Sequence, residues 1–220
     1  MFGGKALDWS VIDTVMLDMD GTLLDQRFDN WFWRELIPDR YAKARGITQP
    51  EAAALLAPKF RAAVGTMRWY CIEYWSEELG LDIAGIKRAA LDQVGFLPGA
   101  QEFLSKLELL GKRRVLLTNA HPVTLAIKNE QVRLSDYFDA CYSTHSFHAP
   151  KEDAAFWPRF NARERFDPQR TLFVDDSIPV LDAAHRFGIA WLRAVRLPDS
   201  GAPAQETGHY AAVDGVADLM

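Results

Sequence analysis

Cysteine is scarce in this chain of 220 residues, which contains only Cys71 and Cys141. Two cysteines are too few for a disulfide framework and are typical of a reducing compartment, so we expect a cytoplasmic protein. No apolar run approaches the roughly 18 residues that a membrane-spanning helix needs, and the first ten residues lack the apolar segment of a signal peptide. The sequence therefore predicts a protein that is neither exported nor embedded in a membrane.

An excess of positive charge is also missing. The chain carries 25 basic and 30 acidic residues, a formal charge of −5, so we expect neither nucleic acid nor an anionic membrane as a partner. An anionic small-molecule substrate would have to be bound by local groups. What is abundant is hydrophobic residues, at 49%, which excludes a disordered, coiled-coil or collagen-like chain and indicates one large domain or one domain with an insert. The residues give no expectation for an oligomeric state.

Short apolar runs rich in β-branched residues predict buried strands. They lie at residues 11–19, 114–118, 140–143, 171–175 and 189–194, and helix-like stretches lie at 122–133, 152–165 and 178–187. Such alternation predicts an α/β fold, with a Rossmann-like parallel sheet covered by helices on both faces. The Gly-, Pro- and polar-rich stretch 199–209 predicts a loop, after which there is room only for a short closing element.

Residues 25–95 break this alternation. They contain helix-like pieces at 51–64 and 83–94, breaks predicted at Pro38, Pro50 and Pro58, and no strand pattern. We therefore expect a core of residues 1–24 and 96–220 with a helical insert at 25–95. The insert holds four tryptophans, Trp31, Trp33, Trp69 and Trp75. Most of its aromatic residues are expected to form a small bundle core, and a minority to line a pocket for a flat ligand.

Polar residues follow the predicted strands at their carboxyl ends, where parallel sheets bind ligands. They are Asp18 and Asp20, Thr118 and Asn119, Lys151 after a short loop, and Asp175 and Asp176. Carboxylates that converge on one crevice repel one another unless a cation lies among them, and hard oxygen ligands suit Mg²⁺. The sequence therefore predicts a magnesium site at this edge of the sheet.

These residue types also provide what phosphoryl transfer needs. Asp18 can attack phosphorus to give an aspartyl phosphate, and Asp20 can protonate the leaving oxygen and then deprotonate water. Lys151 and the Thr118 hydroxyl can hold the phosphoryl oxygens, while a tight turn at Gly21 lets main-chain amides help. We expect phosphatase or phosphotransferase chemistry.

In this order, the residues resemble the haloacid dehalogenase (HAD) superfamily of phosphohydrolases. The resemblance is carried by DMDGT at 18–22, Thr118 in LLTN, Lys151 in HAPKED and DDS at 175–177. It implies that Asp18, the Asp20 carbonyl and Asp176 hold Mg²⁺, with Asp175 acting through water or behind the metal ligands. Dehalogenases of the superfamily lack an acid at the place of Asp20, so the resemblance favours a phosphatase.

An insert between the first two motifs is where this superfamily carries its C1 cap, a mobile helical lid that selects the substrate. Stretches such as FDNWFWREL and WYCIEYWSEELGLDI are similar to those of purine nucleotidases in the superfamily, which act on GMP and IMP. A purine stacked on an aromatic side chain gains about 1–3 kcal/mol. The residues expected to bind the substrate are Gly21, Thr22, Asn119, Phe28, Trp31, Arg68 and Trp69.

Other interpretations of the same residues are less favoured. A signalling receiver domain also gathers acidic residues, Thr and Lys around Mg²⁺, but it carries its acidic pair on the first strand and its phosphorylated Asp on a later one. Here the Asp-x-Asp motif comes first and the Asp-Asp pair last, and an insert of about 70 residues would have no purpose in a receiver. A catalytically silent binder of phosphometabolites, a phosphatase for sugar phosphates or phosphoglycolate, and a phosphomutase are further alternatives. His145 and His148 have a spacing seen in zinc sites, but no Cys or further His is spaced to complete a tetrahedron, so we expect no zinc there. His121 is expected to cap a helix or edge the pocket.

Overall fold

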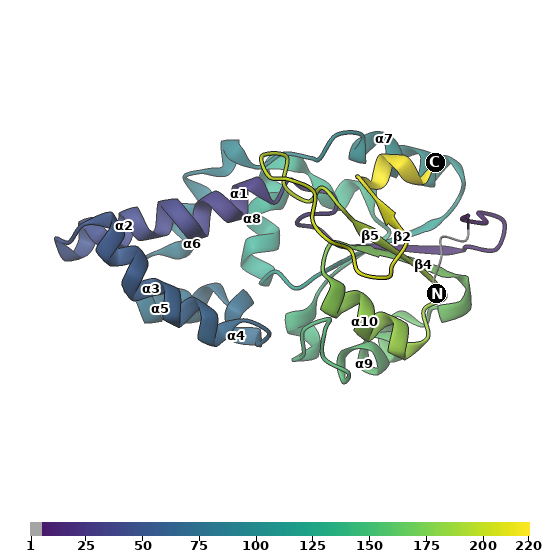
Figure 1. The fold of residues 1–220 in the computed structure, drawn as a ribbon. Helices are drawn as coiled ribbons and strands as arrows, with labels where there is room; N and C mark the ends of the chain where they lie inside the picture. The colour runs from purple at the N-terminus through teal and green to yellow at the C-terminus, as the bar shows by residue number, and fades with distance from the viewer. Residues whose placement is uncertain (1–5) are drawn as a thin grey trace.

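The computed structural model describes residues 6–220, and its centre is a parallel β-sheet (Figure 1). Six strands lie in the order β3-β2-β1-β4-β5-β6, and every neighbouring pair is parallel. Their bounds are β1 Thr14–Leu17, β2 Arg113–Thr118, β3 Ala140–Ser143, β4 Thr171–Asp175, β5 Trp191–Val195 and β6 Ala212–Val213. All five predicted strands are present, and the predicted α/β class with a Rossmann-like sheet is confirmed.

The first strand is shorter than the predicted 11–19, because the Val11 amide donates to the Asp8 carbonyl at 3.1 Å in a turn before the strand. All four residues of β1 are buried. Val15 and Leu17 belong to one hydrophobic cluster, whereas Met16 between them belongs to the other. This alternation puts an apolar core on each face of the sheet, which is why the strand reads as a continuous apolar run.

Helices cover both faces. Helix α7 (Ala100–Leu109) covers one face, whereas α9 (Phe156–Glu164) and α10 (Ile178–Phe187) cover the other (Figure 1). Helix α8 (Pro122–Val132) contacts the helical insert. Short 3₁₀ turns lie at Leu134–Tyr137, Thr144–Phe147, Pro168–Arg170 and Val216–Leu219. Helix α9 begins later than the predicted residue 152, because the Asp153 carboxylate accepts the Ala155 amide at 2.8 Å in a turn.

Residues 25–95, all of which the structure describes, contain helices and no strand, as predicted. The elements are α1 Arg27–Trp31, a π-helical turn Phe32–Leu36, α2 Ile37–Arg45, α3 Gln49–Ala63, α4 Met67–Tyr70, α5 Ile72–Leu79, α6 Ile83–Arg88 and a 3₁₀ turn Leu91–Gln93. The predicted helix at 83–94 is thus divided in two. In Figure 1 these elements form a group beside the sheet.

The prolines of the insert act in three different ways. Pro50 lies in the first turn of α3 behind a capping box formed by Thr48 and Glu51, so the predicted break there is confirmed. Pro38 does not break the chain of helices, because a wider π turn precedes it and accommodates the missing N–H. The break predicted at Pro58 is wrong, since Pro58 lies inside α3 with its ring exposed while Leu56 is buried in the core.

The insert leaves and rejoins the core at one place. The Asp25 amide donates to the Gly95 carbonyl at 3.0 Å, and the Leu97 amide donates to the Leu23 carbonyl at 2.8 Å. An isolated antiparallel bridge pairs Leu24 with Phe96. The segments that precede and follow residues 25–95 are therefore hydrogen-bonded neighbours.

The last part of the chain is mostly irregular. The predicted loop at 199–209 contains neither helix nor strand, and β6 with the final 3₁₀ turn forms the short closing element. None of the helices in residues 6–220 is long and apolar enough to cross a membrane. The expectation that the chain begins without a signal peptide concerns residues 1–10, the first five of which lie outside the described residues.

Candidate active site

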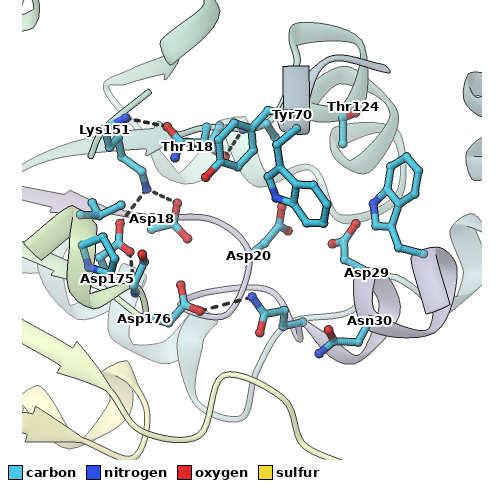
Figure 2. Close-up of a pocket in the computed structure, with 18 of the residues that line it drawn as sticks. Asp18, Asp20, Asp29, Asn30, Tyr70, Thr118, Thr124, Lys151, Asp175 and Asp176 are labelled. Carbon is cyan, nitrogen blue, oxygen red and sulfur yellow. Dashed lines mark hydrogen bonds and ion pairs between the residues drawn. The ribbon is translucent and has the colours of Figure 1, made fainter. Parts of the chain in front are cut away.

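Adjacent strands bring the predicted polar residues to one edge of the sheet. Strand β1 lies between β2 and β4, so the residues that follow these three strands are neighbours in space. Figure 2 shows Asp18, Thr118, Lys151, Asp175 and Asp176 gathered around one opening. The core motifs predicted from the sequence are therefore assembled in one place.

Lys151 lies at the centre of this group. Its side chain is 2% exposed, and its Nζ forms ion pairs with Asp18 and, at 2.6 Å, with Asp175. The Lys151 amide donates to the Asn119 carbonyl oxygen Oδ1 at 2.9 Å, and the Trp157 indole donates to the Lys151 carbonyl at 2.9 Å. These bonds fix the backbone of Lys151, so the ammonium is held against the two carboxylates.

Three carboxylates lie close together here, and the Lys151 ammonium pairs with two of them, Asp18 and Asp175. Oxygens of Asp18, Asp175 and Asp176 all lie within 4.8 Å of one another. Burial raises the pKa of Asp18 to about 6 against the opposing effect of Lys151. Burial, with the charges of Asp175 and Asp18, raises the pKa of Asp176 well above its usual value. The site thus carries more negative charge than its own residues neutralise, which is the condition under which a buried carboxylate cluster binds a cation.

Asp175 and Asp176 differ in how their oxygens are used. Asp175 accepts the Ser177 amide at 2.9 Å with one oxygen and the Lys151 ammonium with the other. Asp176 lines the cavity, and its Oδ2 accepts a hydrogen bond from the side-chain Nε2 of Gln26 at 3.3 Å. Asp176 is therefore the better placed of the two to ligate an ion.

Asp20 is held by a residue that the sequence did not single out. Its Oδ1 accepts a bond from Lys128 Nζ at 2.6 Å, and Lys128, which is 1% exposed, also pairs with Asp29. Lys87 pairs with Asp29 at 2.8 Å. Burial raises the pKa of Asp20 to about 6 even beside Lys128. A lysine in the middle of a helix resembles a surface residue in the sequence, so no signal there identified this buried network.

Three other predicted residues have mainly structural contacts. Thr118 Oγ1 accepts the Ala120 amide at 3.0 Å while lining the cavity. Gly21 has a φ of 86°, and a Cβ there would lie 2.7 Å from Asp176 Oδ2. The Gly21 amide itself donates to the Leu24 carbonyl at 2.8 Å. Thr22 is fully buried outside the cavity lining, and its hydroxyl has no hydrogen-bond partner.

The opening continues into a cavity of about 790 Å³ between the sheet edge and the insert. From the insert, the cavity is lined by the aromatic residues Trp33, Phe60 and Trp69 and by the arginines Arg34 and Arg61. Of the aromatic residues, only Trp69 was predicted as a binding residue. Tyr70 also lines the cavity and donates to Glu152 at 3.0 Å, while Asn119 donates to the other oxygen of Glu152 at 2.9 Å. This arrangement joins the insert to the core beside Lys151.

The remaining predicted binding residues of the insert lie outside the cavity lining. Phe28 is 4% exposed, with Lys87 4.9 Å above its ring. Trp31 packs against Phe28 with ring centroids 6.3 Å apart. Arg68 is exposed and its guanidinium lies over Tyr74, 5.7 Å from the ring centroid. The structure therefore gives no support for base binding by Phe28, Trp31 or Arg68.

The arrangement of a parallel sheet, an inserted helical segment and four polar motifs at the strand ends is matched by a known family. The family model of haloacid dehalogenase-like hydrolases matches residues 12–188, and the chain belongs to this family of hydrolases. GMP/IMP nucleotidase YrfG of Escherichia coli strain K12 is 44% identical over 193 residues, which cover 88% of this chain and 87% of that protein. The protein of the same name from Shigella flexneri is equally similar.

Solved structures show the same fold at lower identity. A HAD phosphatase from Thermococcus onnurineus has a TM-score of 0.78 at 18% identity, covering 94% of this chain and 96% of that chain. Two structures of an L-2-haloacid dehalogenase from Xanthobacter autotrophicus each have a TM-score of 0.64, at 19% and 20% identity, with the same coverage. Because enzymes with different reactions share this fold, the substrate has to be argued from the site.

Proposed function

We propose that the protein is a Mg²⁺-dependent phosphomonoesterase that hydrolyses purine nucleoside 5′-monophosphates, GMP and IMP, through an aspartyl phosphate. The observation that carries this proposal is the group of buried Asp18, Asp175 and Lys151 with half-buried Asp176, at one end of a cavity whose other end is aromatic and cationic. The first end suits a phosphate with its cation, and the second suits a base.

Asp18 is the proposed nucleophile. Lys151 holds one of its oxygens, so the other is available to form a bond to phosphorus while the bond between phosphorus and the ester oxygen breaks. Asp20 gives a proton to that leaving oxygen and then accepts one from the water that hydrolyses the aspartyl phosphate. Lys151 and Thr118 hold the phosphoryl oxygens throughout.

The cluster of Asp18, Asp175 and Asp176 suits a hard divalent cation, because its ligands are all oxygens. Asp18, Asp176 and the main-chain carbonyl of Asp20 are the proposed ligands, and Asp175 orients Lys151 behind them. When bound, Mg²⁺ supplies neutralising charge for the transferring phosphoryl group. This assignment is supported by the geometry of the three carboxylates, whose oxygens lie within 4.8 Å of one another with one ammonium beside them.

The residues that line the far end of the cavity support a purine nucleoside as the leaving group. Trp33, Phe60 and Trp69 offer faces and edges on which a base can stack. Arg34 and Arg61 can donate to neighbouring acceptors on a base, and guanine and hypoxanthine both present O6 and N7 as such a pair, whereas adenine presents a donor beside N7. The similarity to the GMP/IMP nucleotidases agrees with this chemistry.

We further propose that residues 25–95 form a cap over a core of residues 1–24 and 96–220, as the paired crossing segments at Asp25 and Gly95 suggest. A cap that closes over the cavity excludes water from the aspartyl phosphate until hydrolysis. The two free cysteines and the absence of an excess of basic residues support a cytoplasmic enzyme that acts on a small molecule.

Phosphate release from a panel of monophosphates tests the proposal. We expect kcat/KM for GMP and IMP to exceed that for AMP, pyrimidine nucleotides, sugar phosphates and phosphoglycolate by about tenfold or more, which corresponds to roughly 1.4 kcal/mol of selectivity. Chelating Mg²⁺ or changing Asp18→Asn should abolish turnover. A preference for a sugar phosphate or phosphoglycolate would refute the substrate, and an Asp18→Asn variant as active as the wild type would refute the reaction.

A further inference from the structure

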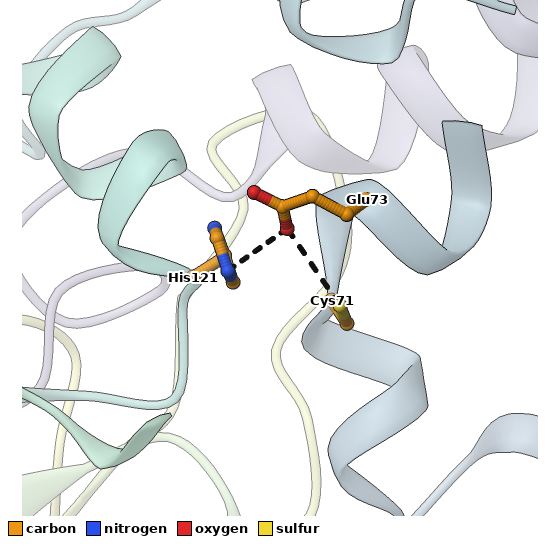
Figure 3. Close-up of side chains that lie close together, drawn as sticks. All are labelled: Cys71, Glu73 and His121. Carbon is orange, nitrogen blue, oxygen red and sulfur yellow. Dashed lines mark hydrogen bonds and ion pairs between the residues drawn. The ribbon is translucent and has the colours of Figure 1, made fainter. Parts of the chain in front are cut away.

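A second group of ligand-type side chains lies outside the aspartate cluster. Cys71 and Glu73 belong to the start of α5 in the insert, and His121 lies at the start of α8 in the core. Their ligand atoms all lie within 4.8 Å of one another. Figure 3 shows the Glu73 carboxylate between the Cys71 thiol and the His121 ring, with the two helices approaching from opposite sides.

The spacing of these atoms suits tetrahedral coordination. Glu73 Oε2 lies 2.9 Å from His121 Nε2 and 3.7 Å from Cys71 Sγ. Bonds of about 2.0–2.3 Å to a central ion would separate tetrahedral ligands by roughly 3.5 Å. The observed separations lie on both sides of that value, so small side-chain movements bring all three ligands to one ion.

A second imidazole, that of His145, lies beside the group. His145 packs edge-on against His121, with ring centroids 4.6 Å apart. Its Nε2 is buried and has no hydrogen-bond partner. Sequence spacing had suggested His145 with His148 as the pair to consider, but the fold instead brings His121 and the distant Cys71 together.

We propose that Cys71, Glu73 and His121 form a second metal site, for a borderline-soft divalent ion of the Zn²⁺ type. The thiolate, imidazole and carboxylate set favours such an ion over Mg²⁺, which prefers the all-oxygen set of the aspartate cluster. On binding, Cys71 releases its proton to solvent. The His121 proton moves from Nε2 to Nδ1, which gives up the long 3.3 Å bond from the Val123 amide.

The site joins the insert to the core. Glu73 and Cys71 move with α5, whereas His121 follows the Thr118-Asn119 strand end, so a bound ion ties the two parts together next to the cavity. Zn²⁺ is therefore expected to slow opening of the cap and to inhibit turnover. This regulatory consequence rests on the proposed function, but the metal site itself does not.

Cobalt(II) is the probe for binding, because a thiolate bonded to Co²⁺ gives a charge-transfer absorption band and Zn²⁺ is spectroscopically silent. The full-length protein would be titrated with Co²⁺ in excess Mg²⁺, which keeps the aspartate cluster occupied. We expect one Co²⁺ per chain with a thiolate band. The Cys71→Ser variant should lose the band and bind at least about tenfold more weakly, a change of roughly 1.4 kcal/mol.

The other cysteine provides a matched control. Cys141 is exposed on β3, and Cys141→Ser should retain the band and the affinity. Glu73, whose side chain is 54% exposed, allows a Glu73→Gln variant that weakens binding without disturbing a buried residue. A thiolate band lost in Cys141→Ser, or Co²⁺ affinities that Cys71→Ser and Glu73→Gln leave unchanged, would overturn the site.

Inhibition is measured separately with Zn²⁺ and p-nitrophenyl phosphate. We expect wild type and Cys141→Ser to be inhibited at Zn²⁺ concentrations that leave Cys71→Ser active. Equal inhibition of all three proteins would overturn the regulatory role while the cobalt spectra still decide the site. An inactive protein that shows the thiolate band would refute the phosphatase and leave the metal site standing.

Discussion

Replacing Lys128 with Met is expected to destabilise the fold by about 3 kcal/mol. Breaking a buried ion pair by removing one partner costs about 3–5 kcal/mol, because the remaining charge is left uncompensated. Lys128 is 1% exposed and is the residue that joins Asp20 to Asp29. The value lies at the lower end of the range because Asp29 keeps its ion pair with Lys87 and both carboxylates are about one-fifth exposed.

Urea denaturation followed by tryptophan fluorescence measures this loss. With an m-value of about 2 kcal/mol/M, 3 kcal/mol lowers the midpoint by ~1.5 M. Lys43→Met is the control, because Lys43 is 67% exposed and its pair with Asp39 is expected to contribute less than about 0.5 kcal/mol. Adding Asp20→Asn to Lys128→Met should recover part of the stability. A loss below about 1 kcal/mol, or no recovery in the double variant, would refute the buried-charge argument.

Three further predictions concern Arg61, Gly21 and His145. Arg61→Met should raise KM for GMP about tenfold in steady-state kinetics and raise KM for AMP less, because Arg61 lines the cavity. Arg68 lies outside the cavity lining, so Arg68→Met should leave KM for both nucleotides unchanged. Gly21→Ala should lower kcat and the thermal midpoint, because its Cβ would displace the Asp176 carboxylate 2.7 Å away; an unchanged kcat would contradict this. Burial lowers the pKa of His145 to about 4 from 6.5, so the folded state favours the neutral ring. Stability should then fall as pH decreases from 6.5 towards 4, and a His145→Phe variant should show a weaker pH dependence in urea titrations.

The sheet and the core motifs could be predicted because each depends on local features of the sequence. Short β-branched runs mark strands that are buried on both faces, and parallel strands necessarily bring their carboxyl ends together. The positions of Asp18 and Asp176 at strand ends follow from those two facts, whereas Lys151 and the choice of Asp176 as a metal ligand were predicted from the order of the motifs in the family resemblance. The strand limits were less exact, as at Val11, where a turn uses an apolar residue that reads as strand.

Most of the residues with which the insert lines the cavity could not be predicted, because which side chains face the cavity depends on how each helix is rotated about its axis. Trp31 and Trp33 are two positions apart and so point to nearly opposite sides of a helix, and the π turn that starts at Phe32 shifts that phase. Trp33 lines the cavity and Trp31 does not.

Prediction from the sequence also missed charged residues that lie in buried positions. Lys128 and Lys87 lie on helices whose sequences give no sign that these side chains are enclosed, since buried lysines are rare and take their place only through partners distant in sequence. The group of Cys71, Glu73 and His121 could not be predicted either, because its members come from two helices that are far apart in the sequence and meet only in the fold.

The paired crossing at Asp25 and Gly95 bears on how such a protein can change over evolution. For the core, the whole insert is a loop whose two ends are already hydrogen-bonded to each other. The entropy of closing a loop grows only with the logarithm of its length, by about 0.6 kcal/mol for each doubling. Helices can therefore be added, removed or exchanged between these two points at little cost to the sheet, so selectivity can diverge while Asp18 and its partners stay in place.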